Sequence, residues 1–211
     1  MRRFWTNNAL SLVLAALFLV FWLAQALTGW AVRNEELEQL RQQTLTWPQY
    51  LASSHFWSAT AENWESEFLQ MAAFVIFTIY LRQRGSAESN PFPEEQTSEE
   101  KKQDQQDSAQ PGFWRRNSLS VVLLSLFAGA LVLHLFSSWD SYNFEQQAEG
   151  QQALNLAQFL SKPDFWFESF QNWQSEFLAV VAIVVLTISL RQVGSSQSKA
   201  LSDANEKTGD S

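Results

Sequence analysis

An internal repeat is the feature of this chain that most constrains its fold. Residues 4–89 align without a gap on residues 113–198, at an offset of 109 positions, with about 35 identities. Phe4-Trp5 returns as Phe113-Trp114, and Asn63–Leu69 returns as Asn172–Leu178. The repeat predicts two copies of one module, so each candidate residue must be considered together with its counterpart.

Each copy holds one long and one short apolar segment. Residues 9–31 and 118–139 contain no Asp, Glu, Lys or Arg and are long enough to cross a hydrocarbon core of ~30 Å as helices. Residues 68–81 and 177–190 have only about 14 residues, a length that alone suits a core helix better. Because each short segment follows a long span and ends in Arg-Gln, we expect it to complete a second span with the polar turns before it.

These segments predict an all-α membrane protein with four transmembrane helices. Two tandem helical hairpins are expected to form a bundle with pseudo-twofold symmetry and helical outer loops. The module boundaries are residues 1–84 for copy 1 and 113–193 for copy 2. The linker 85–112 and the tail 194–211 are rich in Glu, Gln and Ser and are predicted to be disordered and cytoplasmic, because they have little apolar surface to bury.

Arginine residues near the span ends predict the orientation in the membrane. The expected cytoplasmic cationic ends are Arg82, Arg84, Arg115, Arg116 and Arg191. The opposite loops, 32–66 and 140–176, carry mainly carboxylates, so the chain is predicted to lie in the cell (inner) membrane with both termini in the cytoplasm. The first apolar segment begins like a signal peptide, but its copy is internal, and we therefore expect it to remain as an anchor.

A polar stripe marks the candidate functional cluster. Asn63, Ser66, Glu67 and Gln70 lie on one face of a helix, and three of these four residue types recur in the second copy. The long spans add Gln25 and, at the same register, His134. The candidate cluster comprises Gln25, Asn63, Ser66, Glu67, Gln70, His134, Asn172, Ser175 and Glu176. Carboxylates at membrane depth make an ion-handling or pH-sensitive site one interpretation of the cluster. The structural interpretation, which we favour, is that these side chains form hydrogen bonds between helices.

Tryptophan residues gather near the predicted span ends. Amphipathic rings of this kind anchor spans at the two membrane–water interfaces. The predicted anchors are Trp5, Trp30, Trp57, Trp64, Trp114, Trp139, Trp166 and Trp173. The bilayer itself is therefore the first expected partner, a second membrane or envelope protein is the next, and a homo-oligomer is left open.

The composition argues against several functional classes. The chain has no Cys and two His, no metal-ligand spacing and no glycine-rich loop, so neither a metal nor a cofactor is predicted. Its formal charge of −8 and the membrane placement of its basic residues argue against nucleic-acid binding. The leading interpretation is a non-enzymatic scaffold or accessory subunit of the cell envelope. A small channel or transporter using polar pairs at the repeat interface is the alternative, and a lipid-modifying enzyme comes third.

Three motifs carry a resemblance to a known family. Residues 113–120 read FWRRNSLS, residues 63–70 read NWESEFLQ, and residues 81–89 read LRQRGSAES. They resemble an uncharacterised family of bacterial integral-membrane proteins, a domain of unknown function, over both modules. The first copy departs from this pattern, because Thr6-Asn7 stands where the second copy has Arg115-Arg116. The resemblance implies a bacterial membrane protein and implies no mechanism.

Overall fold

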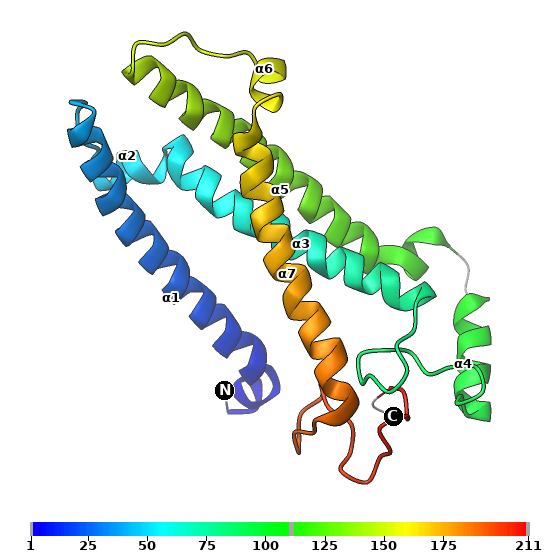
Figure 1. Cartoon of the computed structure of the whole chain (residues 1–211). Coiled ribbons are helices and arrows are strands. Elements are labelled where there is room, and N and C mark those ends of the chain that lie inside the picture. The colour runs from blue at the N-terminus through cyan, green and yellow to red at the C-terminus, as the bar shows by residue number, and fades with distance from the viewer. Residues whose placement is uncertain (1, 110–111, 210–211) are drawn as a thin grey trace. The chain divides into compact units, whose positions relative to one another are not determined.

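The fold is all-helical. The structure, a computed structural model, describes residues 2–109 and 112–209, and within these ranges it has seven helices and no strand. The helices are α1 (Arg2–Gln39), α2 (Trp47–Leu51), α3 (Ser54–Tyr80), α4 (Ser98–Ser108), α5 (Phe113–Ala148), α6 (Leu156–Leu160) and α7 (Pro163–Ser189) (Figure 1). The predicted fold class is therefore confirmed at this level.

The same order of helices occurs on both sides of α4. A long helix, a five-residue helix and a 27-residue helix follow one another as α1–α2–α3 and again as α5–α6–α7. The short helices start at equivalent capping boxes. The backbone N–H of Thr46 donates to Gln49 Oε1 at 2.8 Å, and that of Asn155 donates to Gln158 Oε1 at 2.9 Å. A capping box satisfies backbone donors at a helix start, which allows such short helices to form.

The prediction of four membrane-spanning helices is wrong in number. Among the described residues, three helices are long and apolar enough to cross a membrane, namely α1, α5 and α7. The polar residues in the first half of α3 explain the difference, because they leave a short apolar stretch. Where α3 has Glu62, Glu65 and Gln70, α7 has Gln171, Gln174 and Ala179.

The chain divides into two compact units. The first unit comprises Met1–Thr60 and Leu133–Ser161, and the second comprises Ala61–Val132 and Lys162–Ser211. The core of the first unit joins α1, α2 and the start of α3 through Ala26, Tyr50 and Phe56, which are at most 4 % exposed. Indole rings and leucines surround this core, namely Trp22, Trp30, Leu45, Trp47, Leu51 and Trp57.

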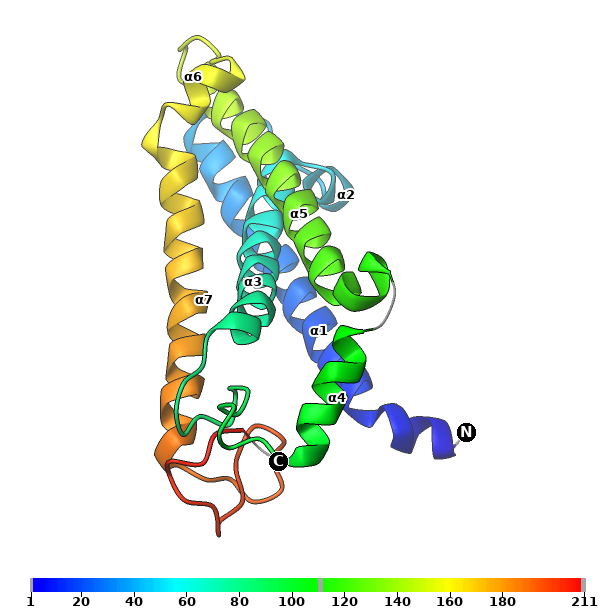
Figure 2. The ribbon, with the colours of Figure 1, turned by 90° about the vertical axis from the view of Figure 1, so that its right-hand side faces the viewer.

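Within the second unit, the segments predicted as a disordered linker and tail contain ordered structure. Helix α4 lies inside the predicted linker, where Thr97 caps it: the Thr97 N–H donates to Glu100 Oε2 at 2.5 Å. Figure 2 shows α4 between the loop after α3 and the start of α5. Local capping explains this helix, since none of its side chains is buried. Residues 110–111 and 210–211 of the predicted linker and tail lie outside the described residues, and the module boundaries stay predictions.

The C-terminal tail folds against the loop that follows α3. Lys199 is 2 % exposed, and its ammonium group donates to the backbone oxygens of Asn205 at 3.0 Å, Lys207 at 2.8 Å and Gly85. The backbone N–H of Gly209 donates to Ser86 O at 2.9 Å. The Lys199 side chain and one long-range backbone hydrogen bond therefore order a segment whose composition predicts no order.

Candidate functional site

Seven residues of the predicted polar cluster lie on α3 and α7 of the second unit. The structure brings Glu67 and Glu176 near one another, so that each carboxyl group acts electrostatically on the other. Glu67 is exposed and Glu176 is half-buried. Two carboxylates at this separation repel one another, and a proton or a cation between them removes the repulsion.

The serines of the motif have a local role. Ser66 Oγ donates to Asn63 O at 2.9 Å, and Ser175 Oγ donates to Asn172 O at 2.8 Å. Each hydroxyl thus bonds the backbone of its own helix, as Ser often does within helices. Gln70 is half-buried beside them.

Glu65 is a functional candidate that the sequence reasoning missed. It is fully buried, and its Oε1 accepts a hydrogen bond from Trp173 Nε1 at 2.9 Å. Asn172 Nδ2 likewise donates to Glu62 Oε1. The Asn-Trp pair of α7 therefore binds two carboxylates of α3, and in α7 those two positions are glutamines. That asymmetry between the copies is the sequence signal that could have revealed the contact.

The two candidates from the long helices belong to the first unit. Gln25 Nε2 donates to Thr60 Oγ1 at 3.4 Å, and His134 is completely buried. Thr28 bonds its own helix through Ala24 O at 2.8 Å. The predicted clusters that combine these residues with Glu67 and Glu176 would join the two units, and they stay predictions.

The loop after each long helix is fixed by the same hydrogen bonds in both copies. Trp30 Nε1 and Asn34 Nδ2 both donate to Leu45 O, at 2.7 and 3.0 Å, and Asn34 Oδ1 accepts from Leu45 N at 2.7 Å. Trp139 and Asn143 bond Leu154 in the same way, at 2.8, 3.0 and 2.7 Å. These polar tips of the indole rings hold the loop against the helix.

The remaining predicted anchors differ in exposure. Trp5 and Trp114, near the starts of α1 and α5, are 61 % and 70 % exposed. Trp57 packs on the core of the first unit, while the Trp166 ring lies at a tilt beside that of Phe170, with ring centres 5.8 Å apart. Trp64 and Trp173 are half-buried. Whether these rings lie at membrane interfaces stays a prediction.

A buried arginine links α1 to α5 within the first unit. Arg33 is 4 % exposed and pairs with Glu36 Oε2 at 3.0 Å and Glu145 Oε1 at 2.9 Å. Its guanidinium lies over the Phe144 ring, 5.3 Å from the centroid. The sequence alone marked Arg33 only as one cation of an acidic loop.

His55 lies near this arginine. Its Nε2 is 4.0 Å from Glu36 Oε2, and its Nδ1 has no hydrogen-bond partner among the described residues. Burial, followed by the Arg33 charge, lowers the pKa of His55 below its usual value, while Glu36 acts in the opposite direction. The neutral imidazole is therefore favoured in the folded protein.

A shallow pocket of about 380 Å³ lies at the surface of the first unit. Its lining combines apolar side chains with Ser and Asp, namely Ala52, Ser54, Trp57, Leu133, Phe136, Ser137 and Asp140. Its walls come from α3, α5 and the turn before α3. Phe136 is 49 % exposed, so this pocket exposes aromatic surface.

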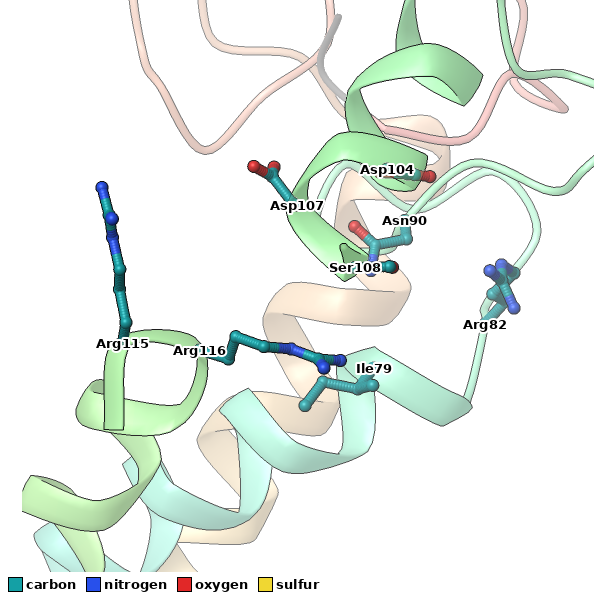
Figure 3. Close-up of a pocket in the computed structure, with 8 residues that line it drawn as sticks. All are labelled: Ile79, Arg82, Asn90, Asp104, Asp107, Ser108, Arg115 and Arg116. Atoms are coloured by element: carbon teal, nitrogen blue, oxygen red, sulfur yellow. The ribbon is translucent and has the colours of Figure 1, made fainter. Parts of the chain in front are cut away.

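The predicted cationic ends lie in the second unit, where they divide into two kinds. Arg84 pairs with Glu94 and Glu95 at 3.0 Å each, and Arg191 Nη1 donates to carbonyl oxygens at the end of α7. In contrast, Arg82, Arg115 and Arg116 line a cavity of about 710 Å³, shown in Figure 3. Its other lining residues are Ile79, Asn90, Asp104, Asp107 and Ser108.

Comparison with known proteins gives one relationship. No curated protein and no solved structure is similar to this chain. The family described as a domain of unknown function, DUF6766, matches residues 1–210. With this match over nearly its whole length and three helices of membrane-spanning character, the chain belongs to that family of unknown function.

Proposed function

We propose that this protein is an integral membrane scaffold or accessory subunit of the bacterial cell envelope, without an enzymatic activity of its own. The chain would be a duplicated module in the inner membrane, with both termini and the linker in the cytoplasm. The repeated order of helices and the repeated Trp-Asn-Leu hydrogen bonds support the duplication. The position of the arginines relative to the spans supports the orientation.

The aromatic core of the first unit, formed by Trp22, Trp30, Trp47, Tyr50 and Phe56, carries the proposal. Its core rings meet at short distances, with Tyr50 5.6 Å and Trp22 6.0 Å from Phe56, and Trp30 5.7 Å from Trp47. The Tyr50–Phe56 and Trp30–Trp47 contacts are edge-to-face, an arrangement that is stabilising beyond the area it buries. The pocket beside Trp57 and Phe136 lies next to this fixed framework, and a preformed aromatic surface is suited to docking a partner.

Site-specific photocrosslinking in cells tests the docking surface. A photoreactive amino acid at Phe136, inside the pocket, should give discrete adducts with an envelope protein. The matched control is Phe167, which is 68 % exposed but lies outside the pocket. In the Phe136 background, Asp140→Lys should weaken the adduct, because it reverses the charge at the pocket.

The crosslinking result has a clear contrary outcome. Equal adduct patterns at Phe136 and Phe167, or adducts with lipid alone at both, would remove the support for a protein-docking surface. Adducts between two copies of this chain would instead identify a homo-oligomer as the partner.

A channel or transporter is the second candidate, and the meeting of Glu67 and Glu176 favours it. Equivalent carboxylates of two repeats that face one another are a typical place for a coupling ion or proton. Under this interpretation, the wild-type protein in proteoliposomes should give a flux of the ion or proton across the membrane. The Glu67→Gln/Glu176→Gln double variant should lose this flux while keeping its thermal stability. Under the scaffold interpretation, the wild-type protein should give no flux above that of empty vesicles.

A further inference from the structure

The cavity of the second unit combines free cations with free acids. In the described part of the chain, Arg115 and Arg116 have no ion-pair partner, and Asp107 has none either. Arg82 uses its Nε to donate to Pro91 O at 3.0 Å, which leaves its two terminal amino groups available. Asp104 accepts one hydrogen bond, from Gln96 Nε2 at 2.9 Å. The cavity therefore offers both signs of charge to a ligand.

Figure 3 shows how these groups are placed. Arg116 extends over Ile79 at the end of α3, and Asp107 comes from α4 on the other side of the space. Asn90 also lines the cavity, and its Nδ2 donates to Thr78 O at 2.9 Å. The guanidinium groups and the carboxylates thus come from different segments of the second unit.

An apolar groove begins at the same arginine. This groove, of about 580 Å³, lies between α3 and α7, and Arg82 lines both it and the charged cavity. Its apolar walls are Phe74, Phe77, Leu81, Val180, Val181, Val184 and Val185. The volume is in the range of sites that hold small organic ligands. A ligand that fills both spaces must carry an apolar chain on a charged head.

The exposed rings of Phe113 and Trp114 place this cavity at the polar end of a spanning helix. These rings are 65 % and 70 % exposed and immediately precede Arg115. Aromatic and cationic residues at a span end are typical of the headgroup level of a bilayer. The bilayer can therefore supply the ligand directly.

We propose that this site binds a phospholipid whose headgroup carries both a phosphate and a primary ammonium, as phosphatidylethanolamine does. Arg82 and Arg116 bind the phosphate, Asp104 and Asp107 accept hydrogen bonds from the ammonium, and one acyl chain occupies the α3–α7 groove. Guanidinium groups bind phosphate through charge-assisted hydrogen bonds. A headgroup with phosphate alone would leave two carboxylates facing it, and a quaternary ammonium could donate no hydrogen bond to them.

Native mass spectrometry of the delipidated full-length protein tests the assignment. Phosphatidylethanolamine, phosphatidylcholine and phosphatidylglycerol with the same acyl chains serve as probes. Loss of charge-assisted hydrogen bonds changes affinity by about tenfold or more. We expect phosphatidylethanolamine to bind at least about tenfold more tightly than either of the other lipids.

Three variants separate the parts of the site. Arg116→Gln should weaken all three lipids, whereas Asp107→Asn should weaken phosphatidylethanolamine alone and leave phosphatidylglycerol as tight or tighter. Arg84→Gln is the matched control, because Arg84 is an exposed arginine near the same loop that pairs with Glu94 and Glu95 outside the cavity. It should leave the lipid preference unchanged.

Several outcomes would overturn the proposal. The proposal would be wrong if the wild-type protein bound the three lipids with equal affinity. It would also be wrong if the protein bound phosphatidylglycerol more tightly than phosphatidylethanolamine. Lipid affinities that were unchanged in both Arg116→Gln and Asp107→Asn would likewise contradict the proposal. Both substituted residues are exposed, so the variants should fold, and the unfolding temperature of each is recorded from Trp fluorescence.

Discussion

Two glycines in the long helices should respond in opposite ways to the same substitution. A Cβ atom at Gly29 in α1 would lie 2.2 Å from the hydroxyl oxygen of Tyr50 and 3.3 Å from its Cζ. Tyr50 is 2 % exposed in the core of the first unit and has little room to move. At Gly129 in α5, a Cβ would meet nothing within 4 Å. Gly29→Ala and Gly129→Ala are therefore a matched pair.

The expected size follows from two opposing terms. Replacing Gly by Ala in a helix interior stabilises it by about 0.5–1 kcal/mol. Forcing an extra methyl group into a packed core costs about 1–3 kcal/mol. We therefore expect Gly29→Ala to lower the free energy of unfolding by about 1–2 kcal/mol, and Gly129→Ala to raise it by about 0.5–1 kcal/mol.

Thermal unfolding in detergent, followed by intrinsic Trp fluorescence, measures both changes. For a chain of this size, 1 kcal/mol shifts the unfolding temperature by about 2–4 °C. A second change tests the cause. Tyr50→Phe removes the atom 2.2 Å from the new methyl group and leaves the ring carbon at 3.3 Å, so the double variant Gly29→Ala/Tyr50→Phe should recover most of the loss.

The contrary results are specific. If Gly29→Ala and Gly129→Ala both raised the unfolding temperature, the close packing of Tyr50 against α1 would be wrong. If Tyr50→Phe did not restore Gly29→Ala, the loss would have a cause other than contact with the hydroxyl group.

Four further predictions concern topology, the buried carboxylate, the histidine and the arginine network. Cysteines introduced at Ser53 and Ser161 should react with an impermeant thiol reagent in spheroplasts and one at Ser98 should not; labelling at Ser98 alone would reverse the proposed orientation. Trp173→Phe removes the donor to buried Glu65 and should destabilise the protein by about 1–3 kcal/mol. Glu65→Gln, which keeps an oxygen acceptor for Trp173 Nε1, should be tolerated in the same unfolding assay. Because the folded-state pKa of His55 is lowered, its contribution to stability is present above the unfolded value of about 6.5 and is lost as the pH falls through the folded value. The unfolding temperature should therefore fall below pH 6.5, and His55→Gln should reduce that slope; an unchanged slope would contradict the assignment. Glu36 and Glu145 are 43 % and 47 % exposed in their side chains, so Glu36→Gln and Glu145→Gln should each cost under about 1 kcal/mol. Their double variant should cost more than the sum, about 2–4 kcal/mol, because buried Arg33 then lacks any carboxylate.

Local features of the sequence determined much of the helical framework. The capping boxes at Thr46 and Asn155 start α2 and α6, and the long apolar segments lie inside α1 and α5. The start of a helix and the length of an apolar segment depend on residues that are near one another in the chain. They can therefore be predicted from the sequence. The repeat also anticipates that Trp30 and Trp139 occupy equivalent positions, from which their indole N–H groups bond the loops after α1 and α5.

The choice among polar residues depended on tertiary packing. Glu67 was selected because it aligns with Glu176, yet Glu65 is the carboxylate that α7 buries and binds through Trp173. The position of residues 68–81 after a long span predicted α3 as a second span, whereas α3, with its three glutamates and Gln70, is not among the described helices that are long and apolar enough to cross a membrane. In the same way, Arg33 and Lys199 acquire their roles from Glu145 and from the oxygen of Gly85, which are more than 100 positions away. Burial of a charge requires partners that only the folded chain brings together, and composition along one segment carries no information about them.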